Sequence, residues 1–115
     1  MKLLTEEIRR KLPGDGAQDG LAGAAIVHAH LFSPYSGWDW YILEHDGGDL
    51  LFCYTVGAHA EYGYVSLAEL EQARRGALPL VERDQHWAPK PIGEVFPAGH
   101  PNRPSWWPGE EVDPC

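Results

Sequence analysis

The strongest constraint on the fold is a run of apolar residues on either side of Asp46-Gly47-Gly48-Asp49. Two adjacent glycines supply the positive φ angles of a tight hairpin, so the pattern predicts antiparallel strands over residues 38–45 and 50–56. Alternate side chains of such strands point to opposite faces. The face expected to form the core holds Tyr41, Leu43, Leu50, Phe52, Tyr54 and Val56. The opposite, more mixed face holds Trp38, Trp40, Ile42, Glu44, Leu51, Cys53 and Thr55.

Two short helices are predicted outside the hairpin. Thr5 precedes two glutamates and is expected to cap a helix that ends near Lys11. Ser66 is followed three residues later by a glutamate, which is the capping-box spacing. Ser66 is therefore expected to cap a second helix that runs from Leu67 to about Arg75 and is stopped by Gly76.

Further strands are predicted over residues 25–32, 62–66 and 79–87. Together with the hairpin and the helices they indicate an α+β fold. We expect a small, mainly antiparallel sheet of about five strands with two short helices packed to one side.

The chain of 115 residues is long enough for one hydrophobic core. Prolines recur every few residues from Pro89 onward, a composition typical of extended segments. We therefore predict one domain over residues 1–93 and an extended, Pro- and Trp-rich tail over residues 94–115. Two placements stay open for Trp106-Trp107 in this tail: a groove of a partner protein, or the sheet face that carries Trp38 and Trp40.

The charge distribution limits the partners. The formal net charge is −8, and residues 12–73 contain nine carboxylates and no lysine or arginine. Nucleic-acid binding depends on cations that replace the counterions of phosphates, so direct binding is not expected. A partner with a basic face is expected instead. The basic clusters Arg9-Arg10-Lys11 and Arg74-Arg75 are expected at helix C-termini, where they complement the helix dipole.

The sequence also predicts a cytoplasmic protein. Acidic residues interrupt the N-terminal segment before an apolar signal sequence can form. No apolar run approaches the roughly 20 residues of a membrane span. Two cysteines, Cys53 and Cys115, are too few for a disulfide framework.

A metal site is one candidate chemistry. His28 and His30 are two residues apart on a predicted strand, so both rings would leave the same face and could bind one zinc ion. Further ligands would come from Glu82, Asp84, His86, Cys53 or Glu44. The alternative is that both histidines line a sheet surface, and we favour it because no third ligand is fixed by spacing. No cofactor is therefore expected.

Carboxylates on neighbouring strands offer a second chemistry. Glu44 and the Glu82-Arg83-Asp84 segment would form an acid/base pair, or Arg83 would pair with Glu44 across the sheet. We favour the pairing, and we assign no catalytic residue. The candidate interaction residues are Trp38, Trp40, Glu44, Glu82, Arg83, Asp84, Trp106 and Trp107.

Several short motifs occur together in a fixed order: Lys2-Leu3-Leu4-Thr5, Trp38-x-Trp40-Tyr41-x-x-Glu44, Gly63-Tyr64-x-Ser66-Leu67-x-Glu69-Leu70, and Glu82-Arg83-Asp84 with Trp87 and Pro89. Over about residues 1–93 the chain thereby resembles a bacterial family of small domains of unknown function, found often among genes of conjugative plasmids and other mobile elements. The resemblance implies a setting in horizontal gene transfer and transfers no catalytic residue.

Two functional hypotheses follow. The first is an accessory or interaction protein of a mobile element that acts by protein contacts, in its sharpest form an acidic decoy for a DNA-binding host protein. The alternative is a small metal-dependent enzyme that uses His28, His30 and a carboxylate.

Overall fold

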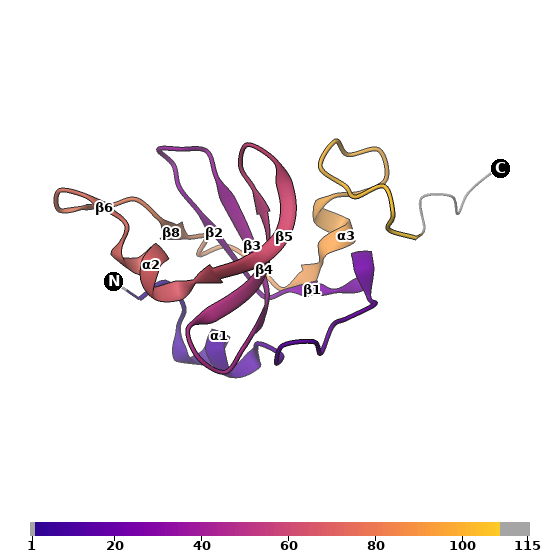
Figure 1. Ribbon diagram of the computed structural model, residues 1–115, viewed down its shortest axis with the longest axis horizontal. Coiled ribbons are helices and arrows are strands. Elements are labelled where there is room, and N and C mark those ends of the chain that lie inside the picture. Colours follow the sequence, from indigo (N-terminus) through magenta and orange to yellow (C-terminus); the bar gives the residue numbers. More distant parts are fainter. Residues whose placement is uncertain (1, 109–115) are drawn as a thin grey trace.

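The computed structural model describes residues 2–108 and has a five-stranded antiparallel sheet at its centre (Figure 1). The strands lie in the order β5-β4-β3-β2-β8. They are β2 (Ala29–Phe32), β3 (Asp39–His45), β4 (Leu50–Val56), β5 (Ala60–Ser66) and β8 (Glu82–Arg83). The predicted α+β class and the five-stranded, mainly antiparallel sheet are confirmed.

Shorter elements surround this sheet. Two two-stranded sheets pair β1 (Ile26–Val27) with β9 (Lys90–Pro91) and β6 (Arg74–Arg75) with β7 (Leu78–Pro79). The helices are α1 (Glu6–Lys11), the 3-10 turn η1 (Ala22–Ala24), α2 (Leu67–Gln72) and α3 (Ile92–Val95). The third helix, α3, was not predicted.

The central hairpin forms as predicted. Gly47 has a φ of 91°, and the Asp46 side chain accepts hydrogen bonds from the backbone N–H groups of Gly48 and Leu50. A β-bulge then shifts the register between Ile42 and Glu44, so that Glu44 lies opposite Phe52. Because a bulge inserts one unpaired residue, the side chains after it change face. Glu44 therefore lies on the opposite face from the one predicted.

Both predicted helix caps are present. Thr5 Oγ1 accepts a hydrogen bond from the Ile8 N–H at 3.1 Å, and Ser66 Oγ accepts one from the Glu69 N–H at 3.1 Å. The second helix is shorter than predicted, because it ends at Gln72. Arg74 and Arg75 then form β6. A turn at Gly76, which has a φ of 63°, joins β6 to its antiparallel partner β7. The prediction that this arginine pair ends a helix is wrong.

The sheet is buried on both faces. One face, which we call the aliphatic face, is covered by residues from the N-terminal segment and by α2. Its core residues are Leu3, Leu4, Leu12, Ala29, Leu31, Trp40, Ile42, Leu51, Cys53, Leu67 and Val81. This is the face that we expected to be mixed. It forms one of the two cores because α2 and the segment before α1 fold across it.

The opposite face, which we call the aromatic face, corresponds to the predicted core. Its buried residues are Ala25, Val27, Leu43, Tyr54, Ile92, Phe96 and Trp107. Tyr41, Phe52, Val56, Tyr62 and Trp87 pack against them. Leu50, predicted to belong here, is 41% exposed because it begins β4 at the end of the hairpin.

Two predicted strands are reduced. The strand expected over residues 25–32 breaks at His28, whose backbone N–H donates to Ile42 O. Val27 lies on the aromatic face and Ala29 on the aliphatic face, so the chain changes face at this break. The strand expected over residues 79–87 is divided between β7 and β8.

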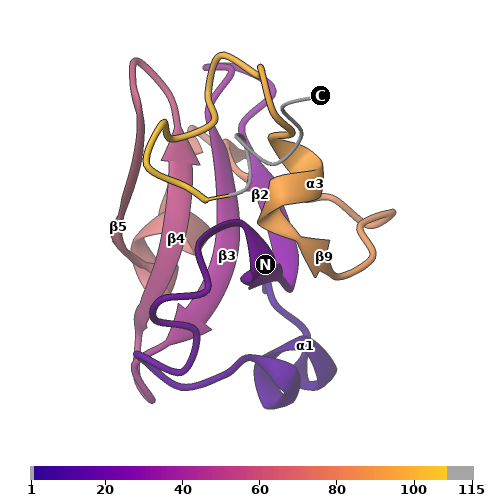
Figure 2. The ribbon, with the colours of Figure 1, turned by 90° about the vertical axis from the view of Figure 1, so that its right-hand side faces the viewer.

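The C-terminal segment covers the aromatic face as far as Pro108. Figure 2 shows α3 and the loop after it in front of the sheet. Phe96 and Trp107 are buried there, and Tyr54 donates a hydrogen bond to Asn102 O. Gly93 packs against the backbone of Gly23, where an added Cβ would lie 2.9 Å from the Gly23 carbonyl oxygen. Residues 94–108 of the predicted tail are thus packed; residues 109–115 lie outside the described residues.

Candidate functional site

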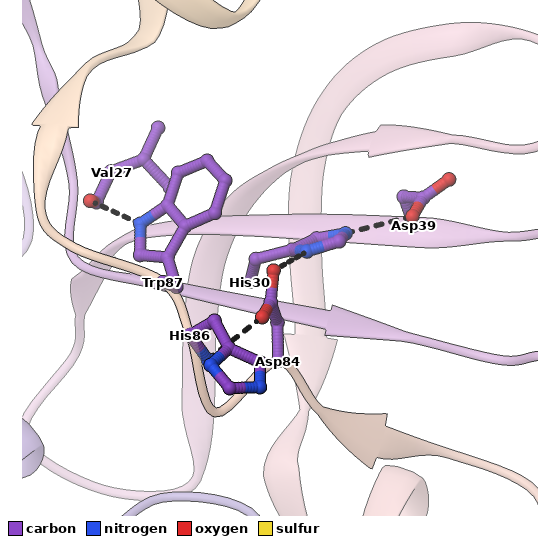
Figure 3. Close-up of polar contacts among 6 residues, drawn as sticks. All are labelled: Val27, His30, Asp39, Asp84, His86 and Trp87. Carbon is purple, nitrogen blue, oxygen red and sulfur yellow. Dashed lines mark hydrogen bonds and ion pairs between the residues drawn. The ribbon is translucent and has the colours of Figure 1, made fainter.

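The most polar cluster of the aromatic face is centred on His30 of β2 (Figure 3). Its Nε2 lies 2.7 Å from Asp39 Oδ1, and its Nδ1 lies 3.0 Å from Asp84 Oδ2. Asp39 begins β3, and Asp84 directly follows β8. One imidazole thus links three neighbouring strands of the sheet, β3, β2 and the end of β8. We call His30, Asp39 and Asp84 the histidine clamp.

The geometry of the clamp links each ring nitrogen of His30 to one carboxylate oxygen. An ionised carboxylate only accepts hydrogen bonds, so both ring nitrogens must carry hydrogen when both aspartates are charged. Asp84 is held further by the backbone N–H of His86, 3.0 Å from its Oδ1. The hydrogen bond from His30, followed by that from His86, lowers the pKa of Asp84. The clamp is therefore a set of three side chains that polar contacts join within the chain.

Aromatic rings enclose the clamp. The Tyr41 ring is stacked on the His30 imidazole, with 4.7 Å between the ring centroids and an interplanar angle of 7°. The centroid of the Trp87 ring lies 5.3 Å from that of the imidazole. Trp87 is fixed by a hydrogen bond from its Nε1–H to Val27 O (Figure 3). Burial, and then the charges of Asp39 and Asp84, raise the pKa of Tyr41 to about 12. The phenol is thus neutral at ordinary pH.

The histidines proposed as metal ligands have separate surroundings. His28 lies beside α1, near Glu7 and Lys11, and burial lowers its pKa. His30 has both ring nitrogens in contact with aspartates, which a metal ion would have to displace. Within residues 2–108, no group of three or more His, Cys, Asp or Glu side chains is arranged to hold a metal ion.

A second polar site is built around Glu44 at the β-bulge. Glu44 is 2% exposed, and its two carboxylate oxygens accept hydrogen bonds from the backbone N–H groups of Gly16 and Gln18, each at 2.7 Å. These bonds fasten the glycine-rich loop of residues 13–21 to the sheet. Arg83, expected to pair with Glu44, instead donates to Leu3 O at 2.9 Å. The predicted pairing of Arg83 with Glu44 is wrong.

Gln18 completes this loop anchor. The Nε2 of its side chain donates to Ile26 O and Leu43 O, each at 3.0 Å. The Oε1 of the same side chain accepts a hydrogen bond from the Ile26 N–H at 2.6 Å. Sequence reasoning missed Gln18, because a lone polar residue in a loop without periodicity carries no signal for its partners.

A cavity of about 260 Å³ opens beside the Glu44 site. Its walls come from the loop, from β3, β4 and β5, and from the C-terminal segment. The lining residues are Gln18, Asp19, Gly20, Ala22, Ala25, Leu43, Glu44, Phe52, Tyr62, Trp106 and Pro108. Trp106 is 65% exposed at its edge, whereas Trp107 is 1% exposed and donates from its Nε1–H to the Tyr62 hydroxyl at 3.1 Å. We call this space the loop cavity.

The eight predicted interaction residues are not brought together. Trp106-Trp107 fold back, but onto the aromatic face and not onto the face of Trp40. Trp38 is exposed and packs over Gly57, where an added Cβ would lie 2.4 Å from the indole. Glu82 lies with Arg83 beside the N-terminal segment. Of the set, only Glu44 and Trp106 share the loop cavity, and Asp84 belongs to the clamp.

Comparison of the chain with models of protein families, with curated proteins and with solved structures found no match in any of the three. Within the described residues, no helix has the length and apolar character that crossing a membrane requires.

Proposed function

We propose that this chain is an interaction protein that binds a basic protein partner, as an accessory protein of a mobile genetic element. The observation that supports this best is a surface of carboxylates and exposed rings along β5. Tyr64 donates from its hydroxyl to Asp15 at 2.6 Å, and Tyr62 and Trp106 are in contact at 6.1 Å between ring centroids. We call the following set the acidic aromatic surface: Asp15, Asp19, Tyr62, Tyr64 and Trp106.

This surface has the chemistry that recognises cations. Carboxylates attract lysine and arginine over the distance of a Debye length, and aromatic faces bind their cationic groups in contact. Arg103 lies beside the surface, but its guanidinium donates to Phe96 O and Pro108 O and lies 5.2 Å from the centroid of the Trp107 ring. The nearest arginine is thus used in holding the C-terminal segment.

The strand order adds a second means of contact. β5 is an edge strand of seven residues in the five-stranded sheet. An edge strand presents backbone donors and acceptors to which another chain can pair. A basic partner would therefore meet charges, rings and an open strand edge on one side of the molecule.

The test is a direct measurement of association. Proteins captured from a bacterial host lysate are purified, and their association rates with the protein are measured at low and high salt. We expect a basic partner whose association slows as salt rises. The variant Asp15→Asn/Asp19→Asn should slow association, whereas the matched control Glu6→Gln/Glu94→Gln should not. Equal effects of the two variants, or binding of duplex DNA by the protein itself, would contradict the proposal.

The decoy form of the proposal makes a further claim. If the partner is a DNA-binding protein, the acidic aromatic surface occupies its DNA site, and the protein should displace DNA from it in a competition assay. A ternary complex of partner, DNA and this protein would exclude the decoy form and leave the interaction itself intact.

A further inference from the structure

The loop cavity is bordered by the buried carboxylate of Glu44, which forms no ion pair among residues 2–108. The Glu44 carboxylate is stabilised by two backbone N–H groups, and the ion pairs found among residues 2–108 do not include it. Each carboxylate oxygen has two lone pairs, so each can accept one hydrogen bond beyond the one observed. A charge that is removed from water is ordinarily matched by an opposite charge. The chain supplies the negative half of such a pair in a cavity wall.

From this arrangement we infer that the loop cavity is a binding pocket for one arginine or lysine side chain of the partner protein. The inference rests on the proposed function and names the anchor point of the interaction. The aliphatic stem of the incoming side chain packs against Leu43 and Phe52, and its cationic group lies between the carboxylates and the ring of Trp106.

The dimensions agree with this occupant. The cavity volume of about 260 Å³ lies just below the roughly 300–1,000 Å³ typical of small-molecule pockets, as suits a single side chain. The walls combine apolar and aromatic groups with two carboxylates, Asp19 at the exposed edge and Glu44 at the buried wall. Long basic side chains need both kinds of surface, because their stems are apolar and their heads are charged.

The chain's own terminus does not fit this chemistry. Residues 109–115, which follow the cavity residue Pro108, contain Glu110, Glu111 and Asp113 and no basic residue. A second copy of the chain has the same formal net charge of −8, so electrostatic repulsion opposes the association of two copies. Charge complementarity therefore favours a foreign, basic side chain.

The test uses two capped peptides on the full-length protein, one with a central arginine and one with citrulline, its neutral isostere. Binding is measured by isothermal titration calorimetry, whose signal does not depend on Trp106. We expect the arginine peptide to bind at least about tenfold more tightly than the citrulline peptide. The variants Trp106→Ala and Asp19→Asn should each weaken arginine binding several-fold. The matched controls Trp38→Ala and Glu94→Gln, which lie outside the cavity, should leave it unchanged.

The outcomes separate this inference from the proposed function. A basic partner that binds equally well to wild type and to Trp106→Ala/Asp19→Asn would overturn the pocket and leave the interaction function standing. The pocket would also be overturned if the two peptides bound equally well, or if neither peptide bound. If the chain instead forms dimers that Trp106→Ala dissociates, the occupant of the pocket is a second copy and the inference is wrong.

Discussion

The two faces of the sheet are both buried, yet they differ in chemistry. The aliphatic face packs leucines and other apolar side chains, with Arg83 reaching only the Leu3 carbonyl at its margin. The aromatic face packs rings and encloses two sets of charges, the histidine clamp and Glu44. Polar groups inside a protein cost stability unless they are hydrogen-bonded. The aromatic face therefore contains groups that the fold has to satisfy and that a purely structural core would not need.

The two polar sites on the aromatic face, the histidine clamp and Glu44, differ in whether the chain itself supplies all of their partners. In the clamp, each ring nitrogen of His30 is matched by an aspartate of the chain itself, so the clamp is complete. Glu44 has donors from the backbone but no cationic partner in the part of the chain that the structure describes, and it borders a cavity. A closed cluster holds the sheet together, whereas an open one has chemistry left for a ligand. This difference is why we place function at the loop cavity and structure at the clamp.

The largest effect is expected from removing the cover of the aromatic face. Trp107→Ala should destabilise the protein by about 3–5 kcal/mol, because a fully buried indole leaves a cavity when truncated. Trp106→Ala, one residue away and mostly exposed, is the matched control and should cost less than about 1 kcal/mol. Urea denaturation measures both. Similar costs for the two variants would mean that the C-terminal segment does not cover this face in solution.

This cover also marks the limit of what the sequence predicts. The hairpin and the two caps follow from local rules, since turn glycines and capping side chains act within a few residues. The packing of Trp107 depends on contacts with Tyr54 and Tyr62, about 50 residues earlier in the chain, which proline spacing does not encode. The sequence predicted part of the clamp, because it identified His30 and Asp84 as candidate functional residues on predicted strands. Their meeting, with Asp39 as third member, depended on strand order.

The face of Glu44 was not predictable either. Strict alternation from Trp40 and Ile42 places Glu44 on the aliphatic face, and a single unpaired residue in the bulge reverses this. No turn or glycine signal marks the bulge, since it lies within a run of good strand formers.

Removal of the buried anion is expected to have the next largest effect. Glu44→Ala deprives the Gly16 and Gln18 N–H groups of their acceptor, and we expect a loss of about 3 kcal/mol in the free energy of unfolding. The exposed control Glu94→Ala should stay within about 0.5 kcal/mol of wild type. A loss for Glu44→Ala as small as that of the control would show that the loop is not anchored through this carboxylate.

The clamp should respond differently from Glu44, because removing the imidazole leaves two neighbouring carboxylates without the group that lies between them. His30→Ala is expected to cost about 2 kcal/mol through the lost hydrogen bonds and the lost stacking on Tyr41. Adding Asp39→Asn and Asp84→Asn to this variant should restore part of the loss, since neutral amides do not repel. His59→Ala, an exposed histidine, controls for the substitution itself. No recovery in the triple variant would show that charge is not what the clamp contributes.

The smallest expected effect is the dependence of stability on pH, and it isolates the electrostatic part of the clamp. The hydrogen bond from His30 lowers the pKa of Asp84 below its ordinary value of 3.8 in the folded protein. A carboxyl group with a depressed pKa stabilises the fold above its unfolded pKa, and this contribution disappears as the pH falls through the folded pKa. Wild type should therefore lose stability more steeply below pH 3.8 than Asp84→Asn, which has no proton to bind at this position.

Denaturation midpoints measured from neutral pH down to this range compare the two slopes. Identical slopes for wild type and Asp84→Asn would mean that the imidazole and Asp84 do not form their hydrogen bond in solution, and the distinction between a closed clamp and an open cavity would then fail.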